Sequence, residues 1–232
     1  MGEIASVIAH ELHQPFAAIV NTSSAAQRRL MNEEADKITV LSEMLPIIAE
    51  QSARAGRVIG GIRKLFEGKQ TERSVEEINS VVAEACELAS NEFKAGTLNI
   101  NQQFSHPSPS TIIDRVQIQQ VIYNLLRNAS DALQNFSTKE VFVSIETITG
   151  DMIRISVRNA GPELSEKTRS KLFEPFFTTK KNGLGMGLYT CQQIVEAHEG
   201  KIWAESCAEK ETTIWFTLPI AGQESERADT VH

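Results

Sequence analysis

The sequence predicts an α+β protein built from a helical hairpin and a two-layer α/β sandwich. Residues 1–67 carry only helix-like spacing of apolar residues, residues 68–77 are polar and charged, and residues 78–220 mix helical spacing with strand-like alternation. With 232 residues, of which 41% are hydrophobic, the chain is long enough to bury a core. We therefore expect a helical domain over 1–67, a linker over 68–77, a sandwich domain over 78–220 and a loose tail over 221–232.

The first domain is expected to be a pair of antiparallel helices that dimerises. In its second half, core positions recur about every 3.5 residues, a period that places a helix along the seam of a left-handed bundle. These positions are Leu41, Leu45, Ile48, Ser52, Ala55, Ile59, Ile62 and Phe66. The polar segment 32–36 is the predicted turn. Because one hairpin has too small a core to stand alone, two copies are expected to form a four-helix bundle.

The second domain is expected to pack helices against an antiparallel sheet. Helical spacing covers 78–95, 115–134 and 188–198, whereas alternation covers 97–104, 141–147, 152–158, 201–205 and 213–218. Gly150 and Asp151 are expected to form the turn of a hairpin within that sheet. This mixture predicts a two-layer sandwich.

Composition excludes several classes of protein. Lys and Arg number 23 against 30 Asp and Glu, so the net charge is −7, which argues against a general nucleic-acid binder. No apolar stretch approaches the roughly 20 residues that a bilayer span needs. The three cysteines are widely spaced and odd in number, which favours free thiols in a reducing compartment.

The predicted helix over 115–134 carries an unusual polar stripe. Gln120, Asn124, Asn128 and Asp131 share one narrow line along it, separate from the apolar face. Short amides disfavour helix interiors, and solvated faces generally use Glu, Lys and Arg instead. Stacked amide oxygens suit Mg²⁺ bound together with nucleotide phosphates. A solvated polar face is the alternative interpretation.

A glycine run precedes the predicted helix near residue 188. Gly183, Gly185 and Gly187 alternate along the chain and lead into Leu188. Such glycines let backbone approach a ligand closely, and the helix N-terminus attracts anions. Lys180 adds positive charge just before the run. Taken alone, the run is equally consistent with a flexible hairpin.

Two further segments have both a structural and a functional interpretation. Asn159 and Gly161 stand at the end of a predicted strand, where a planar ring could lie against backbone while the amide bonds its edge. An ordinary strand-ending turn explains them as well. Residues 173–177, Phe-Glu-Pro-Phe-Phe, are either a lid over a site or part of the core.

Together, in this order, the four motifs resemble the N, G1, F and G2 boxes of sensor histidine kinases. The ATP-binding domain of that family shares a superfamily with gyrase, MutL and ATP-driven chaperones. Residues 8–15, Ile-Ala-His-Glu-Leu-His-Gln-Pro, are similar to the H box of the dimerisation and histidine-phosphotransfer domain. Five boxes in the right order are far more specific than any one of them, and the resemblance covers nearly the whole chain.

His10 is the expected phosphoryl acceptor. It lies about 200° around the helix from Ile8 and Leu12, and so points away from the bundle seam. Glu11 can accept the Nδ1 proton, which leaves Nε2 more nucleophilic. His13 is a competing acceptor without an adjacent acid, and the resemblance selects His10.

The resemblance implies that this is a protein-histidine kinase, dependent on ATP and Mg²⁺. His10 would be autophosphorylated, and the phosphoryl group would pass to an aspartate of a response-regulator receiver domain. Gln14 stands where relatives orient water for phosphatase activity toward that regulator. Asn124 and Asn128 would hold Mg²⁺. The implied nucleotide residues are Asn124, Asn128, Asp131, Asn159, Gly161, Phe177, Lys180, Gly183, Gly185, Gly187 and Leu188.

One residue departs from the family pattern. The adenine contact is usually Asp, whereas this chain has Asn159, whose carbonyl accepts a hydrogen bond without charge assistance. We expect weakened rather than abolished ATP binding. The alternative is a non-catalytic, nucleotide-binding dimer that acts as a signalling scaffold.

No sensor domain precedes the H box in this sequence. We therefore expect the chain to be the cytoplasmic fragment of a longer protein with an upstream sensor; the sequence leaves open whether that protein has a membrane tether.

Overall fold

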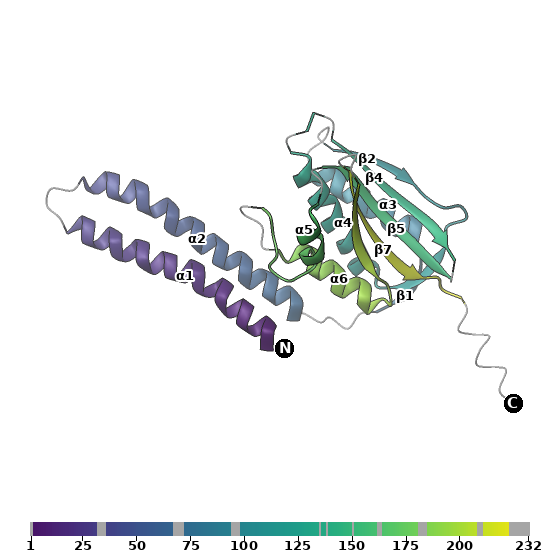
Figure 1. Ribbon diagram of the computed structural model, residues 1–232, viewed down its shortest axis with the longest axis horizontal. Helices are drawn as coiled ribbons and strands as arrows, with labels where there is room; N and C mark the ends of the chain where they lie inside the picture. The colour runs from purple at the N-terminus through teal and green to yellow at the C-terminus, as the bar shows by residue number, and fades with distance from the viewer. Residues whose placement is uncertain are drawn as a thin grey trace. The chain divides into compact units, whose positions relative to one another are not determined.

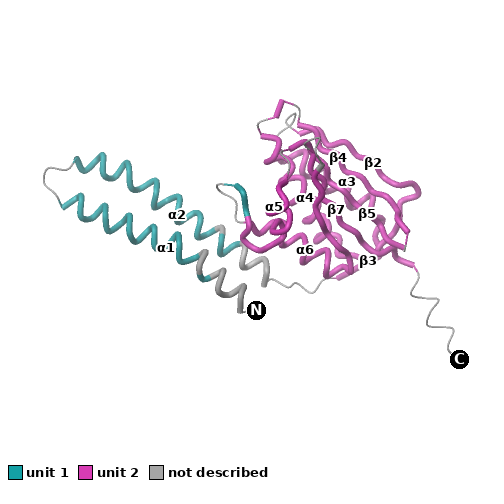
Figure 2. The backbone as a smooth tube through the Cα atoms, viewed as in Figure 1, with its two compact units in different colours: residues 1–69, 178–184 teal, residues 70–177, 185–232 magenta. Residues whose placement is uncertain are grey.

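The computed structural model describes residues 2–31, 36–66, 72–93, 98–134, 136–137, 139–149, 151–161, 164–180, 185–207 and 211–222. Within these ranges, the side chains of 2–8, 10–11, 57, 61–66 and 207 are not described. The chain divides into two compact units, which are residues 1–69 with 178–184 and residues 70–177 with 185–232 (Figure 2).

The first unit is a helical hairpin, as predicted. Helix α1 (Gly2–Leu30) and helix α2 (Lys37–Phe66) pack along one another (Figure 1). Asp36 begins α2, because its carboxylate accepts the backbone N–H of Ile38 at 3.1 Å and the hydroxyl of Thr39 at 2.5 Å. These bonds satisfy N-terminal donors that the helix cannot satisfy itself.

A single hairpin covers only part of its apolar stripe. Val40, Ala55 and Val58 are buried in α2, whereas Leu45 is 56% exposed and Ile59 51% exposed. These last two belong to the predicted seam, so much of that seam faces away from α1. None of the described helices is both long enough and apolar enough to cross a bilayer.

The second unit is an α/β sandwich, which confirms the predicted fold class. Its five-stranded sheet has the order β2-β4-β5-β7-β6, formed by β2 (Asn99–Gln103), β4 (Glu140–Ile148), β5 (Met152–Ala160), β7 (Glu211–Pro219) and β6 (Ile202–Cys207). Helices α3 (Ile78–Glu92), α4 (Arg115–Ala132) and α6 (Gly187–Ala197) cover one face of this sheet (Figure 1).

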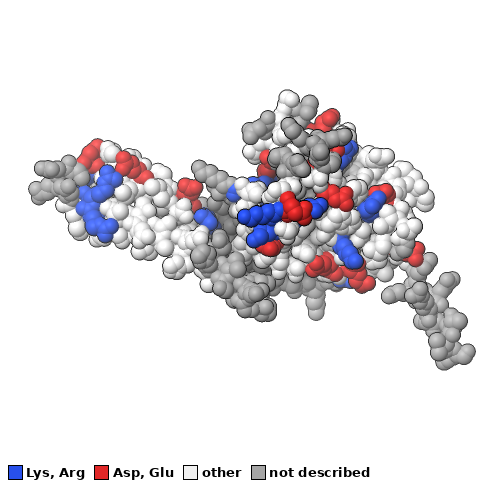
Figure 3. Space-filling view, in the orientation of Figure 1, with Lys and Arg blue, Asp and Glu red and all other residues white. Residues whose placement is uncertain are grey.

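Strand alternation explains why the helices lie on one face only. On β4 and β5, every second residue is buried, and the register pairs Val143 with Val157 and Ile145 with Ile155. The residues between them face outward and include charged pairs such as Arg154 with Glu146. Figure 3 shows acidic and basic side chains intermixed on the face in view. The core therefore lies between the sheet and the helices.

The structure corrects the expected antiparallel sheet in one place. Strands β2 and β4 pair in parallel, with Asn101 opposite Phe142. The chain between them passes through helix α4, and such a crossover is what a parallel pair requires.

The predicted linker over 68–77 is wrong at its end. Its last four residues form β1 (Ser74–Glu77), which pairs antiparallel with β3 (Ser110–Ile113), a strand that the sequence did not suggest. Neither strand is long enough to show alternation. Arg115 on α4 forms a 2.6 Å ion pair with Glu76 on β1 and so holds the strand in place. This contact depends on tertiary structure.

Candidate functional site

Helix α4 carries the predicted amide stripe on a rigid base. Asp114 caps the helix by accepting the backbone N–H of Gln117 at 3.0 Å. Asn124 is only 9% exposed, and Asn128, one turn later, is half-buried, as is Asp131. The burial of Asn124 favours a structural or ligand-binding role over the solvated face that was the alternative interpretation. Two amide oxygens one turn apart can serve a hard cation.

Helix α6 packs against α4 through a buried thiol. Cys191 of α6 is completely buried, and its sulfur lies 3.8 Å from the carbonyl oxygen of Val121 on α4. Burial raises the pKa of Cys191 to about 12, so the group is a neutral thiol at physiological pH.

The end of strand β5 places Asn159 in the interior. This side chain is 7% exposed, and its Nδ2 donates to the carbonyl oxygen of Ala160 at 2.7 Å. The bond directs the amide nitrogen toward the backbone, which makes Oδ1 the end that can accept from a ligand. A Cβ on the neighbouring Gly161 would stand 3.2 Å from Nδ2, so glycine there leaves room for this amide.

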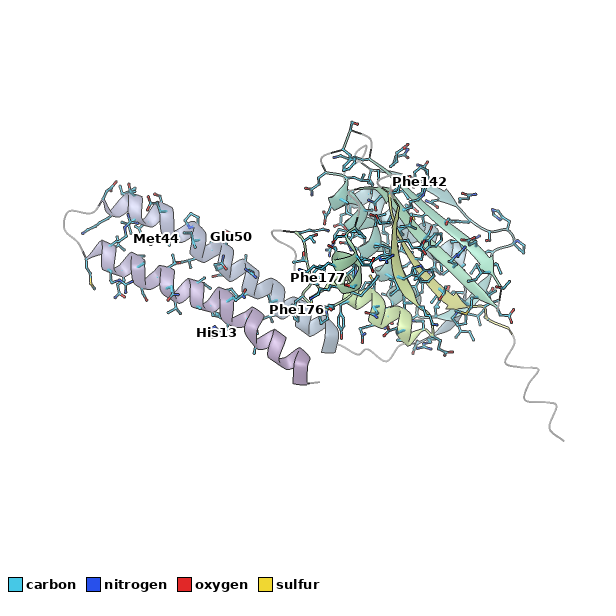
Figure 4. The ribbon with its side chains drawn as sticks, viewed as in Figure 1. His13, Met44, Glu50, Phe142, Phe176 and Phe177 are labelled. Atoms are coloured by element: carbon cyan, nitrogen blue, oxygen red, sulfur yellow. The ribbon has the colours of Figure 1, made fainter. Side chains whose placement is uncertain are left out.

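The aromatic loop and the glycine run meet backbone to backbone. Phe176 has a positive φ of 64° and donates its N–H to the Gly185 carbonyl at 3.1 Å. Gly185 itself has a φ of 66°, and a Cβ on it would lie 2.3 Å from the Phe176 carbonyl carbon. Only glycine fits there. Figure 4 labels Phe176 and the half-buried Phe177 in the loop that precedes α6.

The N-terminus of α6 is the described part of the predicted phosphate cradle. Gly187 is its first residue, and Leu188 packs partly against the core. The first amide to bond within the helix is that of Thr190, to Met186 at 2.9 Å, so the N–H groups of the first turn are available to a ligand. Arg127 of α4 comes close, with Nη2 3.8 Å from where a Cβ on Gly187 would stand.

A buried histidine joins the N-terminal end of α4 to the C-terminal end of α6. His198 is 2% exposed; its Nδ1 lies 2.7 Å from the Ile194 carbonyl, and its Nε2 accepts the backbone N–H of Asp114 at 3.0 Å. Nδ1 therefore carries the proton. Burial lowers the pKa of His198, because the charged form would lose its water. One neutral imidazole thus ties the two site helices together.

Not all the predicted residues fall in this second unit. Lys180 is exposed, and residues 178–184 group with the first unit. Gly183 lies outside the described residues.

The predicted H box lies on helix α1. The backbones of His10 and Glu11 belong to that helix, but their side chains lie outside the described residues. The competing His13 is exposed on α1 (Figure 4), and Gln14 accepts from Nη2 of Arg54 on α2 at 3.4 Å.

Three residues of the site were missed from sequence. Arg127 lies between Asn124 and Asn128 in the sequence, and its positive charge beside a predicted phosphate site was the available clue. Cys191 and His198 gave no clue, because their roles arise only when α6 packs on α4.

Similar proteins agree on the family. Residues 113–222 match the family model described as histidine kinase-, DNA gyrase B- and HSP90-like ATPase. Sensor protein FixL of Bradyrhizobium diazoefficiens is 36% identical over 96% of this chain and 44% of its own length. Sensor histidine kinase TmoS of Ectopseudomonas mendocina is 32% identical over 95% of this chain and 23% of its own. The chain thus spans less than half of these curated relatives.

Solved structures give the same result. The catalytic domain of histidine kinase ThkA is 30% identical, with a TM-score of 0.56, and the match covers 64% of this chain and 95% of that domain. ThkA in complex with response regulator TrrA is 26% identical, with a TM-score of 0.67, over 94% of this chain and 61% of that one. The chain therefore belongs to the sensor histidine kinase family and carries the catalytic core of a two-component kinase.

Proposed function

We propose that the chain phosphorylates itself on His10 with ATP and then passes the phosphoryl group to an aspartate of a response-regulator receiver domain. The observation that carries the proposal is the gathering of buried Asn124, buried Asn159 and the first turn of α6 in one unit. Such a unit can bind a nucleotide and leave its terminal phosphate to a nucleophile. The relative ThkA forms a complex with a response regulator, which supports the partner class.

The chain's own residues have distinct tasks in this reaction. Glu11 accepts the Nδ1 proton of His10, so that Nε2 attacks the γ-phosphorus, the bond to the β,γ-bridging oxygen breaks, and ADP leaves. Asn159 and Gly161 seat adenine, and Phe177 with Leu188 closes the site. The phosphates would be bound by Lys180, Arg127 and the amides of Gly183, Gly185 and Gly187.

The amides of α4 fit a magnesium ion. Asn124 and Asn128 would supply oxygen ligands, with Asp131 one turn further along the same stripe. When bound, Mg²⁺ would neutralise charge on the phosphates. Asn124 is buried and therefore does not face solvent, which favours a role as a ligand.

We also propose that the helical hairpin, residues 1–67, is the dimerisation and phosphotransfer domain and that residues 74–220 bind ATP. Apolar side chains left exposed by the hairpin offer a surface to a second copy. They are Phe16, Val20, Ile38, Leu41, Leu45, Ile47 and Ile59. Leu45→Glu combined with Ile59→Glu should convert the dimer to a monomer in sedimentation velocity. Val116→Glu, at an apolar site 71% exposed in the second unit, should leave the dimer intact.

Autophosphorylation is tested with γ-labelled ATP. We expect label that is stable in base, lost in acid, absent from His10→Gln and retained by His13→Gln. Label that persists in His10→Gln would overturn the acceptor. Nucleotide binding without any label would favour the alternative, a signalling scaffold, whose supporting observation is the uncharged Asn159.

Phosphatase activity is proposed for Gln14. Its contact with Arg54 holds the side chain on the surface of the bundle. Gln14→Ala should slow loss of the regulator's phosphoryl group and leave autophosphorylation intact, as followed on phosphorylated regulator. Equal rates of loss would refute this role. Because the proposed substrate is ATP and the proposed partner is a receiver domain, we propose that this core lies in the cytoplasm.

A further inference from the structure

The face of the sheet that the helices leave uncovered contains a hollow of about 560 Å³, a volume typical of sites for small molecules. The register places Ser144 opposite Ser156 at its centre, with Trp215 next in the same row. Phe142 and Arg158 form the neighbouring row. The hollow exists because two small side chains lie among much larger ones, on strands whose rigid backbone cannot close the gap.

The aromatic side chains of this hollow are held in place by their neighbours. The Arg158 guanidinium lies 4.4 Å from the centre of the Phe142 ring, and its Nη1 donates to both carboxylate oxygens of Glu211 at 2.9 and 3.0 Å. Trp215 donates its indole N–H to Glu205 at 3.0 Å. Because both rings are already ordered, a ligand that binds against them loses less free energy to side-chain ordering.

The floor of the hollow offers a hydroxyl group. The hydroxyl oxygens of Ser144 and Ser156 lie 2.7 Å apart, so one donates to the other. Ser156 is only 4% exposed, whereas Ser144 is half-buried and is the accessible member of the pair. Two hydroxyls carry two protons and four lone pairs, and their mutual bond uses one of each. The pair can therefore bond one further polar group in a place partly shielded from water.

The charges around the hollow favour an uncharged ligand. Of the described residues that line it, Arg158 alone is charged, and Glu211 pairs with that guanidinium. A charged ligand would lose hydration there without gaining a free counter-charge. An aromatic ring, by contrast, gains contact with two aromatic side chains and with the cation beside one of them.

We propose that this hollow is a binding site for a small, neutral aromatic molecule of the phenol class. Its ring lies against Phe142 and Trp215, and its hydroxyl bonds Ser144. The site belongs to the sheet face opposite the helices that carry the nucleotide residues, so its occupation does not depend on the proposed kinase reaction.

The experiment titrates the full chain with p-cresol and follows the indole N–H signals by nuclear magnetic resonance. Trp203 and Trp215 are the two tryptophans of the chain, and both indoles donate to Glu205 at 3.0 Å, so each gives a signal from this face. We expect a saturable shift of the Trp215 signal. Toluene, which lacks only the hydroxyl, should bind about fivefold more weakly, the effect of one net hydrogen bond. The charged 4-hydroxybenzoate should bind at least about tenfold more weakly than p-cresol.

Two variants separate the hydroxyl contact from the ring contact. Ser144→Ala should weaken p-cresol about fivefold, to the affinity of toluene, and leave toluene unchanged. Phe142→Ala should weaken both molecules by the same factor, because it removes ring contact alone. Ser80→Ala is the matched control, since this exposed serine lies on α3, on the other side of the sheet. Its affinities should equal those of the wild type.

Four results would overturn the inference. These are shifts that do not saturate, equal affinities of the wild type for p-cresol and toluene, a preference for p-cresol that survives in Ser144→Ala, and displacement of p-cresol by a non-hydrolysable ATP analogue, which would place the ring in the nucleotide site. Phe142→Leu replaces the alanine variant if that variant does not fold. A chain that binds p-cresol as expected but transfers no phosphoryl group would count against the kinase reaction alone.

Discussion

Replacing Gly185 by alanine should strongly destabilise the second unit. At a φ of 66°, a side chain costs about 1–2 kcal/mol. The added Cβ would also stand 2.3 Å from the Phe176 carbonyl carbon and 2.5 Å from the Phe177 oxygen. Backbone must move to relieve this overlap, which costs about 1–3 kcal/mol when atoms are forced into a packed site. The free energy of unfolding should therefore fall by about 2–5 kcal/mol.

Urea unfolding followed by tryptophan fluorescence reports this change from the right unit. The two tryptophans of the chain, Trp203 and Trp215, lie on β6 and β7 of the sandwich. Gly187→Ala is the matched control, because its nearest neighbour would be a side-chain nitrogen at 3.8 Å. That variant should stay within about 1 kcal/mol of the wild type. Equal costs for the two variants, or a Gly185→Ala variant as stable as the wild type, would refute the reasoning.

Three further predictions concern other residues of the second unit. Asn159→Asp should bind ATP several-fold more tightly in calorimetry, because charge assistance outweighs the amide bond to the Ala160 backbone; unchanged or weaker binding would contradict this. Since burial lowers the pKa of His198 below 6.5, the unfolded chain takes up a proton first as the pH falls. The free energy of unfolding should then decrease by up to about 1.4 kcal/mol per pH unit below 6.5, and this slope should flatten in His198→Gln. Glu205 accepts both indole N–H groups at 3.0 Å, so Glu205→Ala should cost about 1 kcal/mol in urea unfolding and alter tryptophan emission; an unchanged spectrum would argue against the contact.

Long periodic elements were predictable because their pattern is local. The helix expected over 115–134 is observed as Arg115–Ala132, and the strand expected over 152–158 as Met152–Ala160. In each, apolar residues recur with the period of the element, and the period alone selects helix or strand. The ends differ by a few residues because caps and pairing partners decide them.

Short elements escaped prediction for a physical reason. Strand β1 consists of Ser-Val-Glu-Glu, which has one apolar residue and no visible alternation. It exists because β3 pairs with it and Arg115 holds Glu76, and neither partner is close in sequence. The parallel pairing of β2 was missed for the same reason, since strand direction depends on the path of the chain between strands.

The site divides in the same way. Asn124, Asn128, Asn159 and the glycines could be proposed as site residues because each motif occupies a short stretch of sequence. The contacts that hold the site helices together could not be predicted in this way. The hydrogen bond between His198 and Asp114 joins residues far apart in the chain and forms only when α6 packs on α4.

The central claim is that ATP phosphorylates His10, and fragment mass spectrometry at neutral or basic pH tests it most directly. His10 and His13 lie three residues apart, so backbone fragments between them must assign the phosphoryl group. After incubation with ATP and Mg²⁺, we predict one phosphoryl group on His10 and none when Asn128 is replaced by alanine. A phosphoryl group on His13, or an unmodified chain that nevertheless binds ATP, would contradict the account.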